Sequence, residues 1–274
     1  MCPHCRAFIT TSDRVCPYCN ESVGPRAADR ERSPGGLFGG FVPHARFVTV
    51  LILLINFGMY IATTLFSLSS GNRDAVMNPD VNTLFFFGAQ NPRAIFGLHQ
   101  WWRLVTAGFL HGGILHILMN SWVLFDLGAE VEEVYGQHRL ITIYFLSTVC
   151  GFLASAAWGT SLSVGASAGL FGLIGAMIAL GTRYKSGIAG AIRGMYIRWA
   201  VYGIVLGFLP GLRMDNAAHI GGVAAGFAVG YAAGVPSLST GMQERAWRVA
   251  AYLSIALTAF CFLQMLLWFS RITR

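Results

Sequence analysis

The chain has 274 residues, of which 55% are apolar and only 11% charged, and its mean hydropathy is +0.57. A soluble domain carries about 25% charged residues, so this composition excludes a soluble globular protein and predicts a polytopic membrane protein. The net charge of +7 comes from basic residues that fall between apolar segments. That distribution indicates that the basic residues orient the membrane-spanning segments rather than form a nucleic-acid-binding surface.

Residues 1–23 contain two Cys-x-x-Cys pairs, whose four thiols are Cys2, Cys5, Cys16 and Cys19. Four thiolates suit tetrahedral zinc, and a segment this small needs a metal in order to fold. We therefore predict a zinc-ribbon-like module with structural Zn²⁺. Two disulfides or a redox pair are the alternatives, which the expected reducing cytoplasm disfavours. The module could bind a protein partner or cap the terminus, and the residues leave both open.

Residues 24–46 are rich in Arg, Pro and Gly and predict a flexible linker. Seven apolar segments of membrane-spanning length follow, at 47–66, 112–131, 140–158, 166–182, 195–209, 216–234 and 247–269. Between the first two, the less apolar stretch 67–110 contains clustered aromatic residues, among them Trp101 and Trp102. Such clusters are typical of a loop that lies in the membrane interface.

The positive-inside rule orients these spans. With a cytoplasmic N-terminus, 13 of the 19 Lys and Arg residues lie on the cytoplasmic side and 6 on the other. We therefore expect the N-terminus inside and, with seven spans, the C-terminus outside. The first residues lack the basic and apolar segments of a signal or organelle leader, and we expect a bacterial inner membrane.

The second span contains two polar side chains on one helical face, because His116 and Asn120 are four residues apart. Together they could donate hydrogen bonds to a developing oxyanion. Each alone could instead be a packed polar residue that bonds between helices. By helical arithmetic His111 points about 140° away from His116, and we expect it at the junction with the preceding loop.

Ser167 begins the fourth predicted span within the sequence Gly165-Ala-Ser-Ala-Gly169. A hydroxyl at that depth is costly, and polar groups there tend to be functional. Small residues follow it at helical spacing, and in the sixth span His219, Gly222 and Gly226 share one face. Close approach of these two faces would bring His219 towards Ser167, which is the minimum for a serine hydrolase. The same pattern also fits helix packing with an incidental histidine.

Two other classes of function are disfavoured by the residues. An intramembrane metalloprotease would need a His-Glu-x-x-His motif or a carboxylate at ligand spacing, and neither accompanies the histidines. A transporter would place its polar site at the midplane of a structural repeat. Here the polar residues gather towards the non-cytoplasmic side, and no repeat is evident.

Residues 47–234 resemble the rhomboid family of intramembrane serine proteases. The matching motifs, in their order and spacing, are Trp102-Arg103, His111-x4-His116-x3-Asn120, Gly128-x-x-Val-Glu132-x-x-Tyr135-Gly136, Gly165-Ala-Ser167 and Ala218-His219-Ile-Gly-Gly222-x-x-x-Gly226. The resemblance implies an all-α fold with a six-helix protease core at 47–234. The loop and seventh helix at 235–274, like the zinc-ribbon-like module, are additions to that core.

The resemblance also implies the roles of individual residues. Ser167 would be the nucleophile and His219 its general base, in a dyad that needs no aspartate and no cofactor for catalysis. His116, Asn120 and the Ser167 backbone N–H would form the oxyanion hole. The substrates would be transmembrane segments within the lipid bilayer.

The chain departs from the family pattern at two positions. Ala168 stands where many members have glycine, and Phe171 where some have a tyrosine that stacks on the histidine. A phenyl ring can still stack, so we expect modest effects.

Two further expectations concern the surroundings of the site and its activity. Residues 67–110 should border the site, while the fifth span and residues 210–215 should gate access to it. The alternative to a protease is a catalytically silent rhomboid-like protein that binds membrane clients.

Overall fold

The computed structural model describes residues 2, 4–8, 15–21, 46–184, 186–209 and 214–272. The chain divides into two compact units, Met1–His44 and Ala45–Arg274. In the first unit the described residues form two short turns, each of which carries two cysteines. Apart from Arg46, the predicted linker at 24–46 lies outside the described residues.

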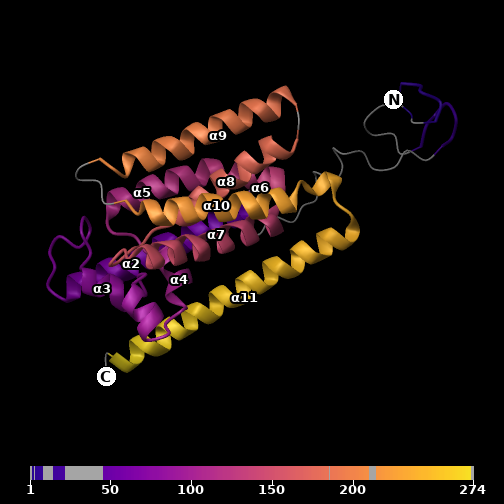
Figure 1. Ribbon diagram of the computed structural model, residues 1–274. Coiled ribbons are helices and arrows are strands. Elements are labelled where there is room, and N and C mark those ends of the chain that lie inside the picture. The colour runs from indigo at the N-terminus through magenta and orange to yellow at the C-terminus, as the bar shows by residue number, and fades with distance from the viewer. Residues whose placement is uncertain are drawn as a thin grey trace. The chain divides into compact units, whose positions relative to one another are not determined.

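The described part of the second unit is all-α and contains seven long helical segments, as the sequence predicts. They are α2 (Phe47–Ser69), the continuous run α5 (Ile114–Val123), η4 (Leu124–Gly128) and α6 (Ala129–Tyr135), then α7 (Gln137–Trp158), α8 (Ser167–Arg183), α9 (Gly187–Leu206), α10 (Asn216–Ala233) and α11 (Gly241–Ile272). Figure 1 shows them as an elongated bundle.

Five of these segments are long and apolar enough to cross a membrane: α2, α5 to α6, α7, α10 with the turn that follows it, and α11. Helix α8 is apolar but has only 17 residues. Helix α9 has 20 residues and covers 187–206, whereas the sequence analysis expects the fifth span at 195–209. The earlier start has a local cause, because the Ser186 hydroxyl accepts a hydrogen bond from the Ala189 N–H and caps the helix.

The segment between α2 and α5 is not an open loop but a series of short helices. These are α3 (Val81–Phe86), η2 (Arg93–Gly97), α4 (Arg103–Thr106) and η3 (Ala107–Phe109). Arg103 is fully buried beneath them, and its guanidinium donates to the carbonyl oxygens of Phe85 and Ala89 at 2.7 and 3.0 Å. A single charged side chain therefore satisfies backbone groups that the irregular chain would leave unpaired.

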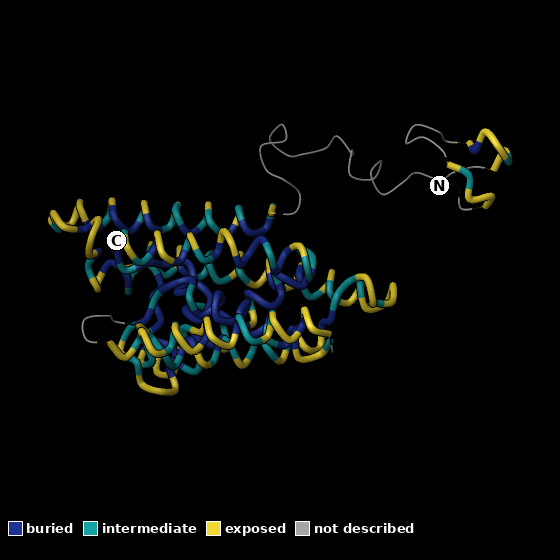
Figure 2. The backbone as a smooth tube through the Cα atoms, turned by 90° about the horizontal axis from the view of Figure 1, so that it is seen from above, coloured by how far each residue is buried: buried dark blue, intermediate teal, exposed yellow. Residues whose placement is uncertain are grey.

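Helix α8 lies at the centre of the bundle. Of its 17 residues 13 are buried, and it packs against α7, α9 and α10. Figure 2 shows the buried stretches inside the bundle and the exposed ones along its outer helices. Its many small residues let neighbouring helices approach closely, which suits this central position.

Helices α8 and α10 approach so closely that their contact face has no room for side chains. A Cβ atom on Gly222 would collide with the carbonyl oxygen of Ala168, and one on Gly226 with the carbonyl oxygen of Gly172. Small residues permit this approach within a membrane, where close packing drives helix association. The contact sets the register between the first turns of the two helices.

Two hydrogen-bonded groups join other helices of the bundle. The Glu132 carboxylate accepts from the backbone N–H groups of Val48 and Thr49, both at 3.0 Å, and so caps α2 from a distant part of the chain. The Tyr135 hydroxyl donates to the carbonyl oxygen of Ala176 at 2.8 Å. These bonds attach α6 to both α2 and α8.

Helix α11 packs against α7 and α4. Near its start, Glu244 forms an ion pair with the buried Arg139 of α7, with an N–O distance of 2.6 Å. Near its end, the Trp268 ring lies 4.7 Å from the Arg103 guanidinium. The seventh helix is thus held to the core at both of its ends.

Candidate active site

Ser167 is the first residue of α8, and the backbone that leads to it is held in place. The Gly165 N–H donates to the carbonyl oxygen of Ala107 at 3.0 Å, while Gln90 and Ser163 exchange two backbone hydrogen bonds. The 67–110 segment therefore borders this loop, as expected. The first N–H groups of a helix have no partner within it, so half-buried Ser167 lies at the positive end of the α8 dipole.

His219 lies in the first turn of α10 with only 1% of its surface exposed. Its ring stacks on Phe171, with centroids 4.0 Å apart and planes inclined by 7°. Phe171 is one turn beyond Ser167 on α8, so these two share a helical face. Gly222, one turn beyond His219, packs against Ala168, the residue after Ser167, so the first turns of α8 and α10 lie against each other.

The His219 imidazole lacks an orienting carboxylate. Its Nδ1 atom is buried and has no hydrogen-bond partner among the described residues. The stacked Phe171 ring fixes the plane of the imidazole instead.

His116 approaches the serine from α5. Its Nδ1 accepts a hydrogen bond from the Gly112 N–H at 3.3 Å, which leaves the proton on Nε2. A Cβ atom on Gly165 would lie 2.8 Å from His116 Nε2 and 3.5 Å from the Ser167 oxygen. The imidazole N–H and the serine hydroxyl therefore both lie next to the Cα of Gly165.

Asn120 follows His116 by one turn on α5, and its buried Nδ2 atom has no hydrogen-bond partner among the described residues. Buried donors are normally paired. An unpaired amide N–H₂ on the helical face of His116 is a donor available to a ligand or a transition state. His111 lies in the loop before α5, as predicted, and its fully buried ring makes an edge contact with His116 at 5.2 Å.

The remaining predicted residues lie around the site rather than in it. Trp102 and Arg103 hold together the segment between α2 and α5, and the Arg103 guanidinium lies between the rings of Phe85, Trp102 and Trp268. Glu132 caps α2, and Gly226 packs further along α10. Their contacts are structural.

The sequence analysis gives no individual role to three side chains near the site, although the expected gating segment 210–215 ends at Asp215. Asp215 precedes α10, its carboxylate accepts from the Ser155 hydroxyl of α7, and the Gln90 side chain is buried with both polar atoms unpaired. An aspartate just before a helix is a recognisable capping signal, whereas nothing local marks Ser155 or Gln90. Residues 210–213 of the expected gating loop lie outside the described residues.

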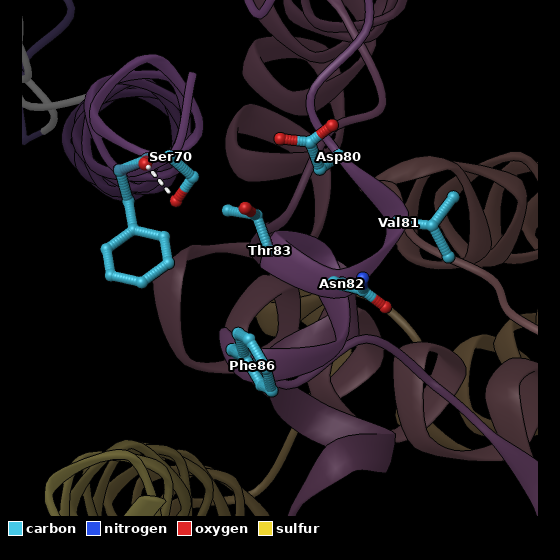
Figure 3. A pocket seen from close by; sticks show the side chains of 7 residues that line it. Ser70, Asp80, Val81, Asn82, Thr83 and Phe86 are labelled. Carbon is cyan, nitrogen blue, oxygen red and sulfur yellow. Dashed lines mark hydrogen bonds between the residues drawn. The ribbon is translucent and has the colours of Figure 1, made fainter. Parts of the chain in front are cut away.

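A surface pocket of about 410 Å³ lies between the end of α2 and α3, and Ser70, Asp80 and Thr83 are among the residues that line it (Figure 3). None of the predicted catalytic or oxyanion residues lines it. The pocket is therefore a separate feature of the surface.

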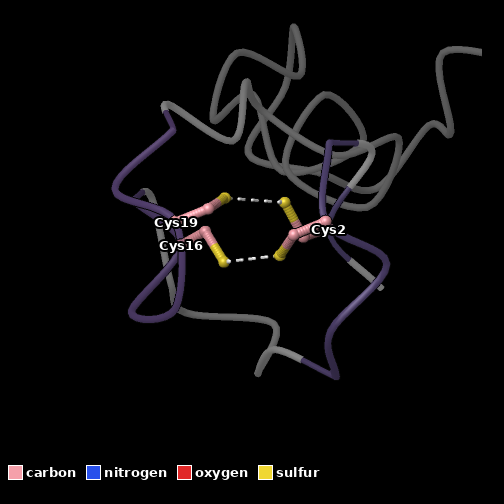
Figure 4. Close-up of side chains that lie close together, drawn as sticks. Cys2, Cys16 and Cys19 are labelled. Atoms are coloured by element: carbon pink, nitrogen blue, oxygen red, sulfur yellow. Dashed lines mark hydrogen bonds between the residues drawn. The ribbon is translucent and has the colours of Figure 1, made fainter.

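The four N-terminal thiols converge (Figure 4), with all four sulfur atoms within 4.8 Å of one another. The Sγ–Sγ distances are 3.7 Å for Cys2–Cys19 and 3.6 Å for Cys5–Cys16. Tetrahedral zinc with bonds of about 2.3 Å holds its sulfur atoms about 3.8 Å apart. The cluster therefore fits a metal ion.

Comparison with known proteins identifies relatives along most of the second unit. A family model described as the rhomboid domain matches residues 98–235. RHOMBOID-like protein 6, mitochondrial, of Arabidopsis thaliana is 34% identical over 171 residues, which cover 61% of this chain and 54% of that protein. Rhomboid protease GluP of Bacillus subtilis (strain 168) is 32% identical over 157 residues, covering 57% of this chain and 31% of the relative.

The similar proteins include one whose name records a loss of activity. Inactive RHOMBOID-like protein 8 of Arabidopsis thaliana is 31% identical over 160 residues, which cover 57% of this chain and 45% of that protein. The matched part thus spans about half or less of the length of these relatives. Since the matching domain nevertheless takes up half of the chain and contains Ser167 and His219, the chain belongs to the rhomboid family.

Proposed function

We propose that this protein is an intramembrane serine endopeptidase that cleaves transmembrane segments with a Ser167–His219 dyad. The observation that supports the proposal is the junction of α8 and α10, where Ser167 begins one helix and the buried His219, stacked on Phe171, lies in the first turn of the other. A rhomboid protease is among the relatives, and so is an inactive member. The alternative is therefore a silent protein that binds membrane clients.

In the proposed reaction, the Ser167 oxygen attacks the carbonyl carbon of the scissile peptide bond while His219 takes the hydroxyl proton. The carbonyl oxygen becomes an oxyanion, which receives hydrogen bonds from His116 Nε2–H, Asn120 Nδ2–H and the Ser167 backbone N–H. Collapse of this intermediate breaks the C–N bond, and the His219 proton passes to the leaving amine.

The second half of the reaction regenerates the enzyme. A water molecule gives its proton to His219 and attacks the acyl-serine ester, and the proton then returns to the Ser167 oxygen as the C–O bond breaks. The chemistry uses one base and one set of donors and requires no cofactor. The unpaired Asn120 Nδ2 supports this role, because it is a donor for which the resting protein supplies no acceptor.

A fluorophosphonate probe tests the proposal directly, because it phosphonylates only an activated serine. We expect the purified full-length protein to be labelled and to cleave a reporter transmembrane substrate. Ser167→Ala should lose both activities while it accumulates normally, and His219→Ala should do the same. Labelling or cleavage that persists in Ser167→Ala would contradict the proposal, and a wild-type protein that binds the reporter without labelling would support the silent client-binding alternative.

We propose a bacterial inner membrane as the location, with the N-terminus in the cytoplasm and the C-terminus outside. The distribution of Lys and Arg supports this topology. We also propose that the cluster of four cysteines holds structural Zn²⁺, supported by sulfur distances that suit a tetrahedral thiolate site.

A further inference from the structure

Asp215 stands just before α10, the helix that carries His219, and all three of its oxygen atoms accept hydrogen bonds. Asp215 precedes α10, and one of its carboxylate oxygens accepts from the Ala218 N–H at 3.0 Å. Its backbone carbonyl accepts from the N–H of His219 itself at 3.0 Å. The first turn of α10, and with it the backbone of the histidine, is therefore built on Asp215.

The second carboxylate oxygen of Asp215 leaves the helix and reaches α7. It accepts a hydrogen bond from the Ser155 hydroxyl, a residue with no exposed surface. One turn earlier on α7 stands Gly151, where an added Cβ would lie only 2.7 Å from the carbonyl oxygen of Ala218. The first turn of α10 is thus held against two successive turns of α7, by the close approach at Gly151 and by the hydrogen bond from Ser155.

The His219 ring needs this support because little else fixes it. Nothing among the described residues hydrogen-bonds to its Nδ1. Stacking on Phe171 defines the plane of the ring, but a ring can slide and turn within a stacked plane at small cost. The position of the imidazole within that plane must therefore come from the backbone of α10.

We propose that Asp215 is a positioning residue for the general base. It joins the first turn of α10 to Ser155 of α7 and so holds the His219 imidazole where it can take the proton of Ser167. This inference rests on the proposed protease function. It assigns to an aspartate outside the dyad the orienting task that a triad gives to a carboxylate on the imidazole itself.

Two substitutions separate geometry from charge. Asp215→Ala removes both carboxylate bonds, and because a displacement of about 1 Å costs about 100-fold in rate, we expect kcat to fall about 10- to 100-fold. KM should change less than about twofold, because both carboxylate oxygens of Asp215 accept hydrogen bonds within the protein, from the Ala218 N–H and the Ser155 hydroxyl. Asp215→Asn keeps an oxygen for the Ala218 N–H and offers an N–H₂ group to the Ser155 oxygen, so it should retain kcat within about threefold.

Two more variants complete the set. Ser155→Ala breaks only the bond between the helices, and we expect an intermediate fall in kcat of about 3- to 10-fold. Ser186→Ala is the matched control, because it removes the same type of cap from α9, a helix without a dyad residue. It should leave kcat within about twofold of the wild type.

The experiment measures, for the full chain in detergent, kcat and KM on the reporter substrate and the rate of fluorophosphonate labelling. Thermal unfolding of each variant identifies a temperature at which all of them are folded. The expected order of kcat is wild type, Ser186→Ala and Asp215→Asn together, then Ser155→Ala, then Asp215→Ala.

Three results would overturn the inference while the proposed function stands: wild-type kcat in Asp215→Ala, a fall in Asp215→Asn as large as in Asp215→Ala, or an equal fall in Ser186→Ala. Wild-type kcat in Asp215→Ala would show that Asp215 has no role in positioning. An equal fall in Asp215→Asn would show that Asp215 acts through its charge, and an equal fall in Ser186→Ala would show that loss of any helix cap lowers activity through general stability. A wild-type protein without Ser167-dependent labelling would instead overturn the proposed function and this inference with it.

Discussion

Gly165 shows how much of the site depends on the absence of a side chain. Its φ angle of +134° lies where L side chains rarely fit, and an added Cβ would lie 2.8 Å from the His116 ring. The glycine therefore serves two needs, the turn that leads into α8 and the close approach of His116 to Ser167.

Gly165→Ala should lower kcat by about 100-fold, because the methyl group must push His116 away from the serine. Gly159→Ala is the control, since Gly159 also has a positive φ of 90° but nothing within 4 Å of its added Cβ. Gly159→Ala therefore introduces the backbone strain of a side chain at positive φ but no steric clash with a neighbouring residue. Kinetics on the reporter substrate for both variants would test this, and an equal loss of kcat would show that strain alone matters.

Asn120 gives a second prediction at this scale. None of the described residues accepts a hydrogen bond from its Nδ2, so a substitution breaks no such bond in the resting protein. Loss of an oxyanion-hole donor, by contrast, lowers kcat by about 100- to 1,000-fold. Asn120→Ala should therefore lower kcat by that amount and change the free energy of unfolding by less than about 1 kcal/mol.

The neighbouring Ser121 offers a matched control, since its hydroxyl is also buried and unpaired but is not on the helical face of His116. Ser121→Ala should leave kcat within about twofold. Steady-state kinetics and thermal unfolding of the two variants provide the comparison. A fall in stability of Asn120→Ala with unchanged kcat would make Asn120 a packing residue.

At the scale of elements, the start of the seventh helix is held by a small group of polar contacts. The Arg139 guanidinium is buried and donates to both Glu244 carboxylate oxygens, at 3.1 and 2.6 Å, and to the Ser239 hydroxyl at 2.7 Å. A buried guanidinium that loses its carboxylate partner remains charged, and the unpaired buried charge destabilises the folded state. The start of α11 is therefore more sensitive to a change in charge than to a change in shape.

Glu244→Gln keeps the shape and removes the charge. We expect it to lower the free energy of unfolding by about 1–2 kcal/mol, below the cost of breaking a fully buried pair because a third of the Glu244 side chain is exposed. Thermal unfolding in detergent would measure this. The double variant with Arg139→Met should recover part of the loss, and additive effects of the two substitutions would show that the pair is not coupled.

At the scale of the whole molecule, local pattern predicted the helices well. Apolar runs located all seven long segments, and small residues predicted the close contact between the first turns of α8 and α10. Bonds between distant residues were not predictable, because Ser155 and Asp215 are 60 positions apart and Arg139 and Glu244 are 105 apart. Neither pair leaves a periodic signal. The short helices around Arg103 were missed because they depend on its buried guanidinium rather than on local propensity.

The cysteine cluster gives a prediction of its own, since it belongs to the first compact unit and the rhomboid domain to the second. Purified protein should contain about one zinc per chain by elemental analysis, and Cys16→Ser should lose it, because structural zinc needs all four ligands. Cys150→Ser is the control, as that thiol lies alone on α7. Fluorophosphonate labelling of Ser167 should be unchanged in both. Full zinc content in Cys16→Ser would remove the ribbon assignment.

The attachment of α11 at both ends has a mechanical consequence. Its 32 residues extend about 48 Å at 1.5 Å per residue, well beyond the hydrocarbon thickness of about 30 Å. A free helix of that length would adjust to a thinner or thicker bilayer by tilting alone. This one is fastened to Arg139 at one end and, through Trp268, to Arg103 at the other. A change in its tilt must therefore be accommodated by the contacts at Arg139 and Arg103, at the two ends of the helix.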